Sequence, residues 1–175
     1  MNLIFIGYRA SGKTTVGALV ARRLGWRFVD LDEQIIQRAG GKSIKEIFAA
    51  EGEAGFRKRE REAFEGLRRV KCCVIALGGG APLDPEIRGF VKRLGRVIWL
   101  KAPAAVLWSR INQDPSTGKN RPDLGAGGLA EVEALLTQRE AVYQSMANHI
   151  LDTVGDTPEQ LSEATELWFM ANDAD

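Results

Sequence analysis

The chain has 175 residues, of which 45% are hydrophobic and 27% are charged, and its formal net charge is +1. This length predicts a single domain, residues 1–175, with a core large enough to fold without disulfides or a structural metal. The near-zero net charge gives no support to a role in binding nucleic acid or a membrane surface. No apolar run is long enough to span a bilayer and no signal peptide is apparent, so we expect a cytoplasmic protein.

The two cysteines, Cys72 and Cys73, are adjacent in an apolar run. Neighbouring cysteines cannot staple a fold, and their spacing does not match a zinc site. We therefore expect two buried thiols in a reducing compartment.

Strands and helices are expected to alternate along the chain. Apolar runs predict strands at about 2–6, 27–30, 72–77, 96–100 and 149–151. Periodicity and end signals predict helices at about 13–24, 53–69, 84–94 and 129–147, and others that begin near Ser43, Pro103 and Pro158. This alternation predicts an α/β protein with a parallel sheet and helices on both faces. Ligands of such sheets bind beyond the carboxyl ends of the strands, so functional residues are expected there.

The most specific motif is the run Gly-Tyr-Arg-Ala-Ser-Gly-Lys-Thr-Thr at 7–15, which follows an apolar strand and opens a helix. This is a phosphate-binding loop, whose glycines let the backbone N–H groups approach the phosphates of a nucleotide. Lys13 is expected to reach the β- and γ-phosphates, and Thr14 to place its hydroxyl on Mg²⁺. The expected ATP-binding residues of the loop are Gly7, Ala10, Ser11, Gly12, Lys13, Thr14 and Thr15.

Two carboxylates, Asp30 and Asp32, stand where the second strand ends. A phosphoryl-transfer site needs an acidic residue near Mg²⁺, and the strand that ends at Leu77 offers none. One carboxylate would hold the water shell of the metal and the other the acceptor hydroxyl. The alternative is that one of them merely caps the helix that follows.

Two loops also follow strands or helices at this edge. The triple glycine Gly78, Gly79 and Gly80 ends a strand and indicates close approach of the backbone to a ligand, with a plain loop as the alternative. The long polar stretch at about 113–128 carries Arg121, which fits a cation on a closing lid, although a solvated loop arginine would look the same.

Two arginines lie on helices beside possible partners. Arg57 and Glu60 are three residues apart, and Arg139 and Tyr143 are four apart. Such spacings are typical of ordinary surface pairs, but an arginine that binds a substrate carboxylate would look the same in sequence. Nothing local decides between these interpretations.

Taken together, the motifs resemble those of the shikimate kinase family over nearly the whole chain. The matching segments are the phosphate loop, Phe28-Val29-Asp30-Leu31-Asp32, Glu51-Gly52-Glu53-Ala54-Gly55-Phe56-Arg57 with Glu60, Val74-Ile75-Ala76-Leu77-Gly78-Gly79-Gly80, Arg121-Pro122, and Arg139 with Tyr143. The resemblance implies a P-loop nucleoside-monophosphate-kinase-like three-layer sandwich with a central five-stranded parallel sheet. It also implies a substrate-binding helical segment at about 31–62 and a mobile lid at about 112–127.

The resemblance further implies the reaction: ATP-dependent phosphorylation of the 3-hydroxyl of shikimate, in aromatic amino acid biosynthesis, with Mg²⁺ as cofactor. Asp32 would orient or deprotonate the attacking hydroxyl, Arg57 and Arg139 would bind the shikimate carboxylate, and the three glycines would lie against the ring. The remaining implied contacts are Glu60 with Arg57, Asp30 with Mg²⁺ through water, and Arg110, Arg121 and Asp156 with the nucleotide.

The chain departs from the family pattern at Leu77, Asp123 and Ala141, and its lid looks several residues long. These departures bear on rate and affinity more than on reaction class. Two alternatives stay open: a related kinase that acts on gluconate or a nucleoside monophosphate, and a non-catalytic nucleotide-binding protein that has kept the fold. A monomer is the expected oligomeric state.

Overall fold

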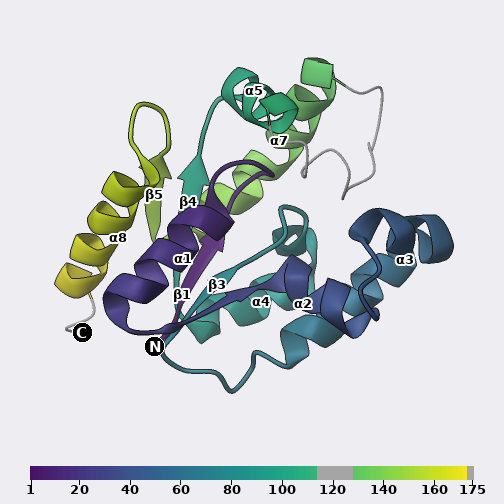
Figure 1. The fold of residues 1–175 in the computed structure, drawn as a ribbon, viewed down its shortest axis with the longest axis horizontal. Helices are drawn as coiled ribbons and strands as arrows, with labels where there is room; N and C mark the ends of the chain where they lie inside the picture. The colour runs from purple at the N-terminus through teal and green to yellow at the C-terminus, as the bar shows by residue number, and fades with distance from the viewer. Residues whose placement is uncertain (114–127, 173–175) are drawn as a thin grey trace.

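The computed structural model describes residues 1–113 and 128–172 and forms a five-stranded parallel sheet between two layers of helices (Figure 1). The strands, in the spatial order β2-β3-β1-β4-β5, are β1 Leu3–Ile6, β2 Arg27–Asp30, β3 Cys73–Ala76, β4 Arg96–Lys101 and β5 His149–Asp152. The described helices are α1 Lys13–Leu24, α2 Leu31–Arg38, α3 Ile44–Glu65, η1 Ala81–Leu83, α4 Pro85–Leu94, α5 Ala104–Gln113, α7 Gly128–Met146 and α8 Pro158–Asn172. The expected fold class is confirmed.

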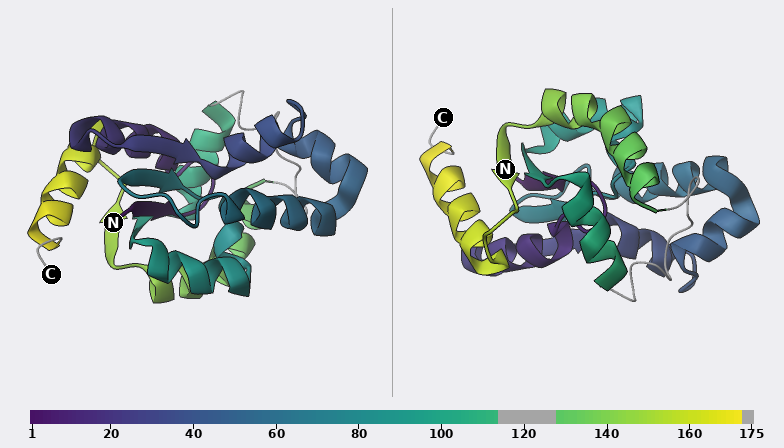
Figure 2. Two further views of the ribbon diagram at one scale, coloured as in Figure 1. Left: turned by 90° about the horizontal axis from the view of Figure 1, so that it is seen from below. Right: turned by 90° about the horizontal axis from the view of Figure 1, so that it is seen from above.

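The two faces of the sheet bury alternate residues of the same strands. In β1, Ile4 and Ile6 pack with α2, α3, α4 and α7, whereas Leu3 and Phe5 pack with α1 and α8. Figure 2 shows these two layers on either side of the sheet. A central parallel strand is covered on both faces, so its sequence reads as a continuous apolar run.

The parallel pairing brings the carboxyl ends of the strands to one edge. Ile6 lies opposite Trp99, and Asp30 lies opposite Ala76. The phosphate loop, the two aspartates and the triple glycine therefore emerge side by side although they are far apart in sequence. The sequence predicts the functional site at this edge of the sheet.

Several predicted helix ends are confirmed. Gly25 ends α1 in the left-handed conformation with φ of 66°. Ser43 and Glu46 form a complete capping box at the start of α3. Thr157 and Gln160 exchange the corresponding bonds before α8. These local signals have local causes, since each satisfies backbone groups that a helix end leaves unpaired.

Two expectations need correction. The helix expected from about Ser43 and the charged helix expected at about 53–69 form the two parts of α3, which are joined at a kink where Gly52 has φ of 67°. The charged part ends at Glu65 and not at about 69. Only one of the two cysteines is buried, because Cys73 points into the sheet core while Cys72 is exposed in the turn before β3. Within the described residues, no helix has the length and apolar character needed to cross a membrane.

Candidate active site

A cleft opens at the carboxyl edge of the sheet, between the phosphate loop, α2, α3, the glycine loop and the start of α7. Its lining residues are Tyr8, Arg9, Asp32, Ile44, Phe48, Phe56, Arg57, Glu60, Gly78, Gly79, Gly80, Glu131, Leu135 and Arg139. The apolar side chains come largely from α3, and the charged ones surround the glycine loop. The cleft therefore offers an apolar wall and several fixed charges to one small polar ligand.

The phosphate loop has the backbone geometry that its sequence predicts. Gly7 and Gly12 have positive φ angles of 143° and 97°, and Ala10 has φ of 61°. A Cβ atom on Gly7 would lie 2.5 Å from the carbonyl oxygen of Leu100, so this position has no room for a side chain. Lys13 Nζ donates to the carbonyl oxygens of Gly7 and Tyr8, at 2.9 and 2.7 Å. Its ammonium group therefore lies across the loop.

Asp30 combines the two roles between which the sequence could not choose. Its Oδ1 atom caps α2 by accepting from the backbone N–H groups of Asp32 and Glu33, at 3.0 and 3.4 Å. Its Oδ2 atom accepts a 2.6 Å hydrogen bond from the hydroxyl of Thr14. The cap thus holds a carboxylate oxygen against the threonine of the phosphate loop.

This pair of oxygens suits a hard cation that keeps most of its water. Mg²⁺ is usually bound in proteins by one or two side-chain oxygens together with water and substrate phosphates. Thr14 and Asp30 supply such oxygens, and the described residues contain no cluster of three or more His, Cys, Asp or Glu side chains that would form a dedicated metal cage.

Asp32 lies at the floor of the cleft against the glycine loop. A Cβ atom on Gly78 would lie 2.7 Å from its Oδ1 atom and 3.3 Å from Oε1 of Glu60. A side chain at position 78 would therefore displace the carboxylate. The first glycine of the triplet is therefore needed for space beside these two carboxylates, whereas the expected approach of the loop to a ligand stays a prediction.

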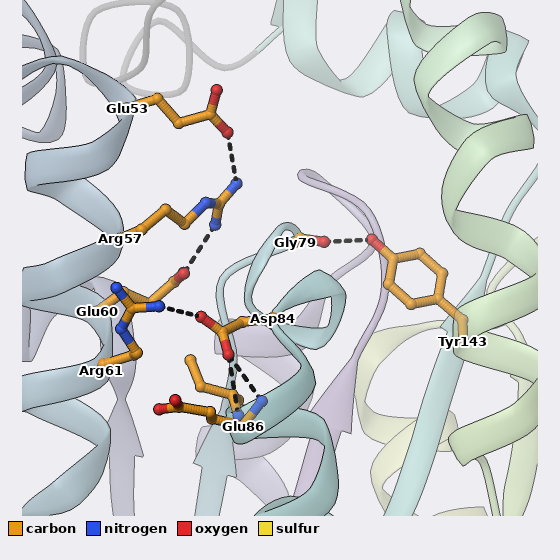
Figure 3. Close-up of polar contacts among 9 residues, drawn as sticks. Glu53, Arg57, Glu60, Arg61, Gly79, Asp84, Glu86 and Tyr143 are labelled. Atoms are coloured by element: carbon orange, nitrogen blue, oxygen red, sulfur yellow. Dashed lines mark hydrogen bonds and ion pairs between the residues drawn. The ribbon is translucent and has the colours of Figure 1, made fainter.

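Arg57 is part of an ion-pair network that the sequence could not distinguish from a surface pair (Figure 3). Its Nη1 atom lies 2.7 Å from Oε2 of Glu60, and its Nη2 atom lies 3.4 Å from Oε1 of Glu53. The Glu60 side chain is only 1% exposed. Burial raises the pKa of the Glu60 carboxyl above its ordinary value of 4.5, against the opposing attraction of Arg57. An ion pair this deeply buried is a built feature of the cleft and not a solvated pair.

The glycine loop lies between the two arginines. A Cβ atom on Gly80 would lie 2.6 Å from Nη2 of Arg57, and one on Gly79 would lie 3.4 Å from Nη1 of Arg139. The Arg139 side chain is buried, and its guanidinium carbon lies 5.3 Å from the ring centre of Tyr8. Two guanidinium groups from α3 and α7 thus face one cleft across a backbone that carries no side chains.

Known proteins resemble this chain in sequence and in fold. The family model described as shikimate kinase matches residues 9–167. The chain belongs to the shikimate kinase family. A shikimate kinase of Nitrosomonas europaea is 44% identical over 87% of this chain and 70% of that protein. A shikimate kinase from Acinetobacter baumannii, solved in complex with shikimate, is 32% identical and superposes with a TM-score of 0.91 over 99% of this chain and 95% of that one.

In this shikimate kinase family member, Arg110 joins the phosphate loop to the loop after β5. Its Nη1 and Nη2 atoms donate to the hydroxyl and the carbonyl oxygen of Thr153, at 2.9 and 2.6 Å, and Nη1 also lies 3.5 Å from the carbonyl oxygen of Ala10. Asp156 follows on the same loop and is exposed. Arg121, Pro122 and Asp123, with most of the expected lid, lie outside the described residues.

Some residues of the cleft were not predicted from the sequence. Tyr8 and Arg9 occupy the variable positions of the phosphate loop, where the motif specifies no residue, yet both line the cleft. Glu131 is 7% exposed on the first turn of α7 and had no local signal at all. Phe48 and Phe56 stack at 4.6 Å and form the apolar wall. Only the packing of distant elements brings these five residues together.

Proposed function

We propose that this protein is a shikimate kinase, which transfers the γ-phosphoryl group of ATP to the 3-hydroxyl of shikimate and releases shikimate 3-phosphate and ADP. The observation that carries the proposal is the acceptor cleft, where Arg57 and Arg139 flank the glycine loop beside Asp32 and next to a phosphate loop. The family relationship supports the same activity, because the solved relative from Acinetobacter baumannii is described in complex with shikimate.

The acceptor half of the site is proposed to recognise a carboxylate and a hydroxyl on one small ring. Arg57 and Arg139 would bind the carboxylate, since guanidinium groups match its planar geometry. Asp32 would hold the attacking hydroxyl and accept its proton. The Glu60 carboxylate keeps the Arg57 guanidinium in one orientation before substrate arrives, which lowers the entropy lost on binding.

The donor half is proposed to bind the triphosphate of ATP along residues 7–15. Backbone N–H groups and the start of α1 would face the phosphates, and Lys13 would exchange its loop carbonyl partners for phosphate oxygens. Thr14 would hold Mg²⁺ directly and Asp30 through water. Bound there, the ion would supply positive charge to the phosphate oxygens. Arg110 and Asp156 would adjoin the nucleotide.

The remaining assignments stay predictions. Phosphoryl transfer needs an in-line acceptor and exclusion of water. We propose that residues 31–62 form the substrate-binding segment and that residues 112–127 form a lid whose Arg121 closes over the phosphates. We also propose a cytoplasmic monomer that acts on ATP and shikimate in aromatic amino acid biosynthesis.

An assay with a panel of acceptors tests the proposal. The protein, ATP and Mg²⁺ are incubated with shikimate, gluconate or a nucleoside monophosphate, and ADP release is followed. Turnover stimulated by shikimate alone is the expected result. Turnover with gluconate instead would identify a related small-molecule kinase. Tight ATP binding with no phosphorylated acceptor would indicate a non-catalytic nucleotide-binding protein.

A further inference from the structure

A buried hydrogen bond connects α7 to the glycine loop. Tyr143 of α7 is completely buried, and its hydroxyl donates to the backbone carbonyl oxygen of Gly79 at 2.5 Å (Figure 3). Its ring packs separately against Trp99 of β4, with ring centres 5.7 Å apart. The ring therefore fills the core between helix and sheet, while the hydroxyl reaches the glycine loop.

Each carbonyl group of the glycine loop accepts a hydrogen bond, but from different sources. The carbonyl oxygens of Gly78 and Gly80 accept backbone N–H groups at 3.0 Å within the turn that forms η1. The carbonyl oxygen of Gly79 accepts the hydroxyl of Tyr143. Since glycines have no side chains to limit their backbone angles, hydrogen bonds such as these determine how the peptides are oriented. The middle peptide takes its orientation from α7.

The Gly79 peptide lies where the two halves of the site meet. A Cβ atom on Gly79 would lie 3.3 Å from the carbonyl oxygen of Gly7 and 3.4 Å from Nη1 of Arg139. In a trans peptide the C=O and the following N–H point in opposite directions. With the carbonyl directed at Tyr143, the N–H of Gly80 points away from the Tyr143 hydroxyl. Figure 3 shows Arg57 on the other side of Gly79 from Tyr143.

We infer that Tyr143 is a positioning residue for the acceptor. By donating to the Gly79 carbonyl, its hydroxyl keeps the glycine backbone in the orientation that receives the substrate ring. Helix α7 then supplies two parts of the acceptor half one turn apart, the Arg139 guanidinium and the Tyr143 hydroxyl. This inference rests on the proposed function, because its kinetic consequence is defined for shikimate.

The test compares Tyr143→Phe with a matched loss of a buried hydroxyl elsewhere. Tyr143→Phe keeps the ring that packs on Trp99 and removes the hydroxyl that donates to Gly79. The control is Thr165→Val in α8: Thr165 is completely buried, and its hydroxyl donates to the carbonyl oxygen of Leu161 at 2.8 Å on the other face of the sheet. For both variants and the wild type, kcat and KM are measured for shikimate, and Kd is measured for ATP.

For Tyr143→Phe we expect the KM for shikimate to rise about 5- to 10-fold, because the buried carbonyl of Gly79 loses its donor and the loop samples other orientations. The Kd for ATP should stay within about 2-fold, and Thr165→Val should match the wild type in both constants. Hydrogen–deuterium exchange without substrate should be about 10-fold faster at residues 78–83 in Tyr143→Phe alone.

The outcomes separate this inference from the proposed function. If the wild type does not phosphorylate shikimate, the proposed function is wrong, and the exchange experiment still decides whether Tyr143 orients the loop. If the wild type is active and Tyr143→Phe has an unchanged KM for shikimate, the inference is wrong. It is also wrong if exchange at residues 78–83 is unchanged, or if ATP binding weakens as much as shikimate binding.

Discussion

Arg57 and Glu60 show how single residues prepare the acceptor site. The glutamate is almost completely buried and lies 2.7 Å from the arginine, which is itself 20% exposed toward the cleft. Taking a carboxylate out of water is costly, and the guanidinium group offsets part of that cost. We infer that burial of the Glu60 carboxylate lowers the free energy of unfolding, while its bond to Arg57 fixes the guanidinium in position for a substrate carboxylate.

Replacing the arginine should affect one substrate only. We expect Arg57→Ala to raise the KM for shikimate at least about 30-fold. The variant would lose the proposed ion pair between Arg57 and the substrate carboxylate, and truncating one member of a buried charged pair costs on the order of 2–5 kcal/mol. The Kd for ATP should stay nearly unchanged. Lys58→Ala is the matched control, because the Lys58 side chain is 76% exposed. An equal loss of ATP affinity in Arg57→Ala would show that the division into donor and acceptor halves is wrong.

The raised pKa of Glu60 gives a pH dependence with a definite sign. Its folded-state pKa lies above the ordinary value of 4.5, so between these values the folded protein binds more protons than the unfolded chain. The contribution of Glu60 to the free energy of unfolding must then fall as pH rises through that window. Comparison of urea unfolding for the wild type and Glu60→Gln across this window measures the contribution.

We expect the wild-type free energy of unfolding, relative to that of Glu60→Gln, to decrease as pH rises above 4.5 toward neutrality. The glutamine does not titrate, so the slope of the difference against pH, rather than its size, measures the titration of Glu60 together with its ion pair to Arg57. A difference that increases with pH would contradict the raised pKa.

At the scale of secondary structure, α3 is bent at Gly52, and the parts on both sides of the bend line the cleft. Gly52 has φ of 67° and ψ of −174°, and the helix resumes immediately after it. Glu51 and Arg59 form two hydrogen bonds across the bend, at 2.8 and 2.7 Å. The first part of α3 contributes Phe48 to the cleft wall and the second contributes Arg57. The sequence predicted two helices here, but not that both would face the same cleft.

At the opposite edge of the sheet, the side chain of Asn2 forms hydrogen bonds with three backbone groups. Asn2 is 1% exposed; its Nδ2 atom donates to the carbonyl oxygens of Val70 and Leu94, both at 2.9 Å, and its Oδ1 atom accepts from the backbone N–H of Cys73 at 3.1 Å. These bonds connect β1 to the segment before β3 and to the end of α4. No local pattern predicts these bonds, because the partners are far away along the chain.

We expect Asn2→Ala to lower the free energy of unfolding by about 3 kcal/mol, because it leaves one buried and two partly buried backbone groups without their partner. Urea unfolding at equilibrium provides the measurement. Asn172→Ala is the control: Asn172 is exposed near the end of α8, and its replacement should cost less than about 0.5 kcal/mol. Equal effects of the two replacements would show that the Asn2 bonds do not stabilise the sheet.

For the whole molecule, binding of the acceptor should appear as added stability. A ligand at 100 times its Kd that binds only the folded state adds about 2.7 kcal/mol to the free energy of unfolding. For a domain of this size that corresponds to a rise in Tm of about 5–10 °C. We expect shikimate to produce this shift and gluconate to produce none, in a thermal unfolding measurement. A shift with gluconate alone would favour the alternative kinase.

The fold and the backbone geometry of the phosphate loop were largely predictable from the sequence. Local contacts between residues close in sequence determine the phosphate loop and most helix ends. The same local patterns show where strands and helices follow one another along the chain. The acceptor half was only partly predictable. Asp32 and the glycine loop followed from their places at strand ends, but Arg57 and Arg139 were left ambiguous by their own surroundings. The resemblance to shikimate kinases, and not local physics, assigned them.

By itself the sequence determined an α/β domain with a nucleotide-binding loop, since glycine conformation, helix caps and apolar runs act over a few residues. Tertiary structure decided the rest. It buried Glu60 behind Arg57, brought Arg139 to the same cleft from α7, and set the Tyr143 hydroxyl on Gly79 across 64 residues. Burial and hydrogen bonding between distant residues depend on how the elements pack around the sheet, and no local pattern encodes that arrangement.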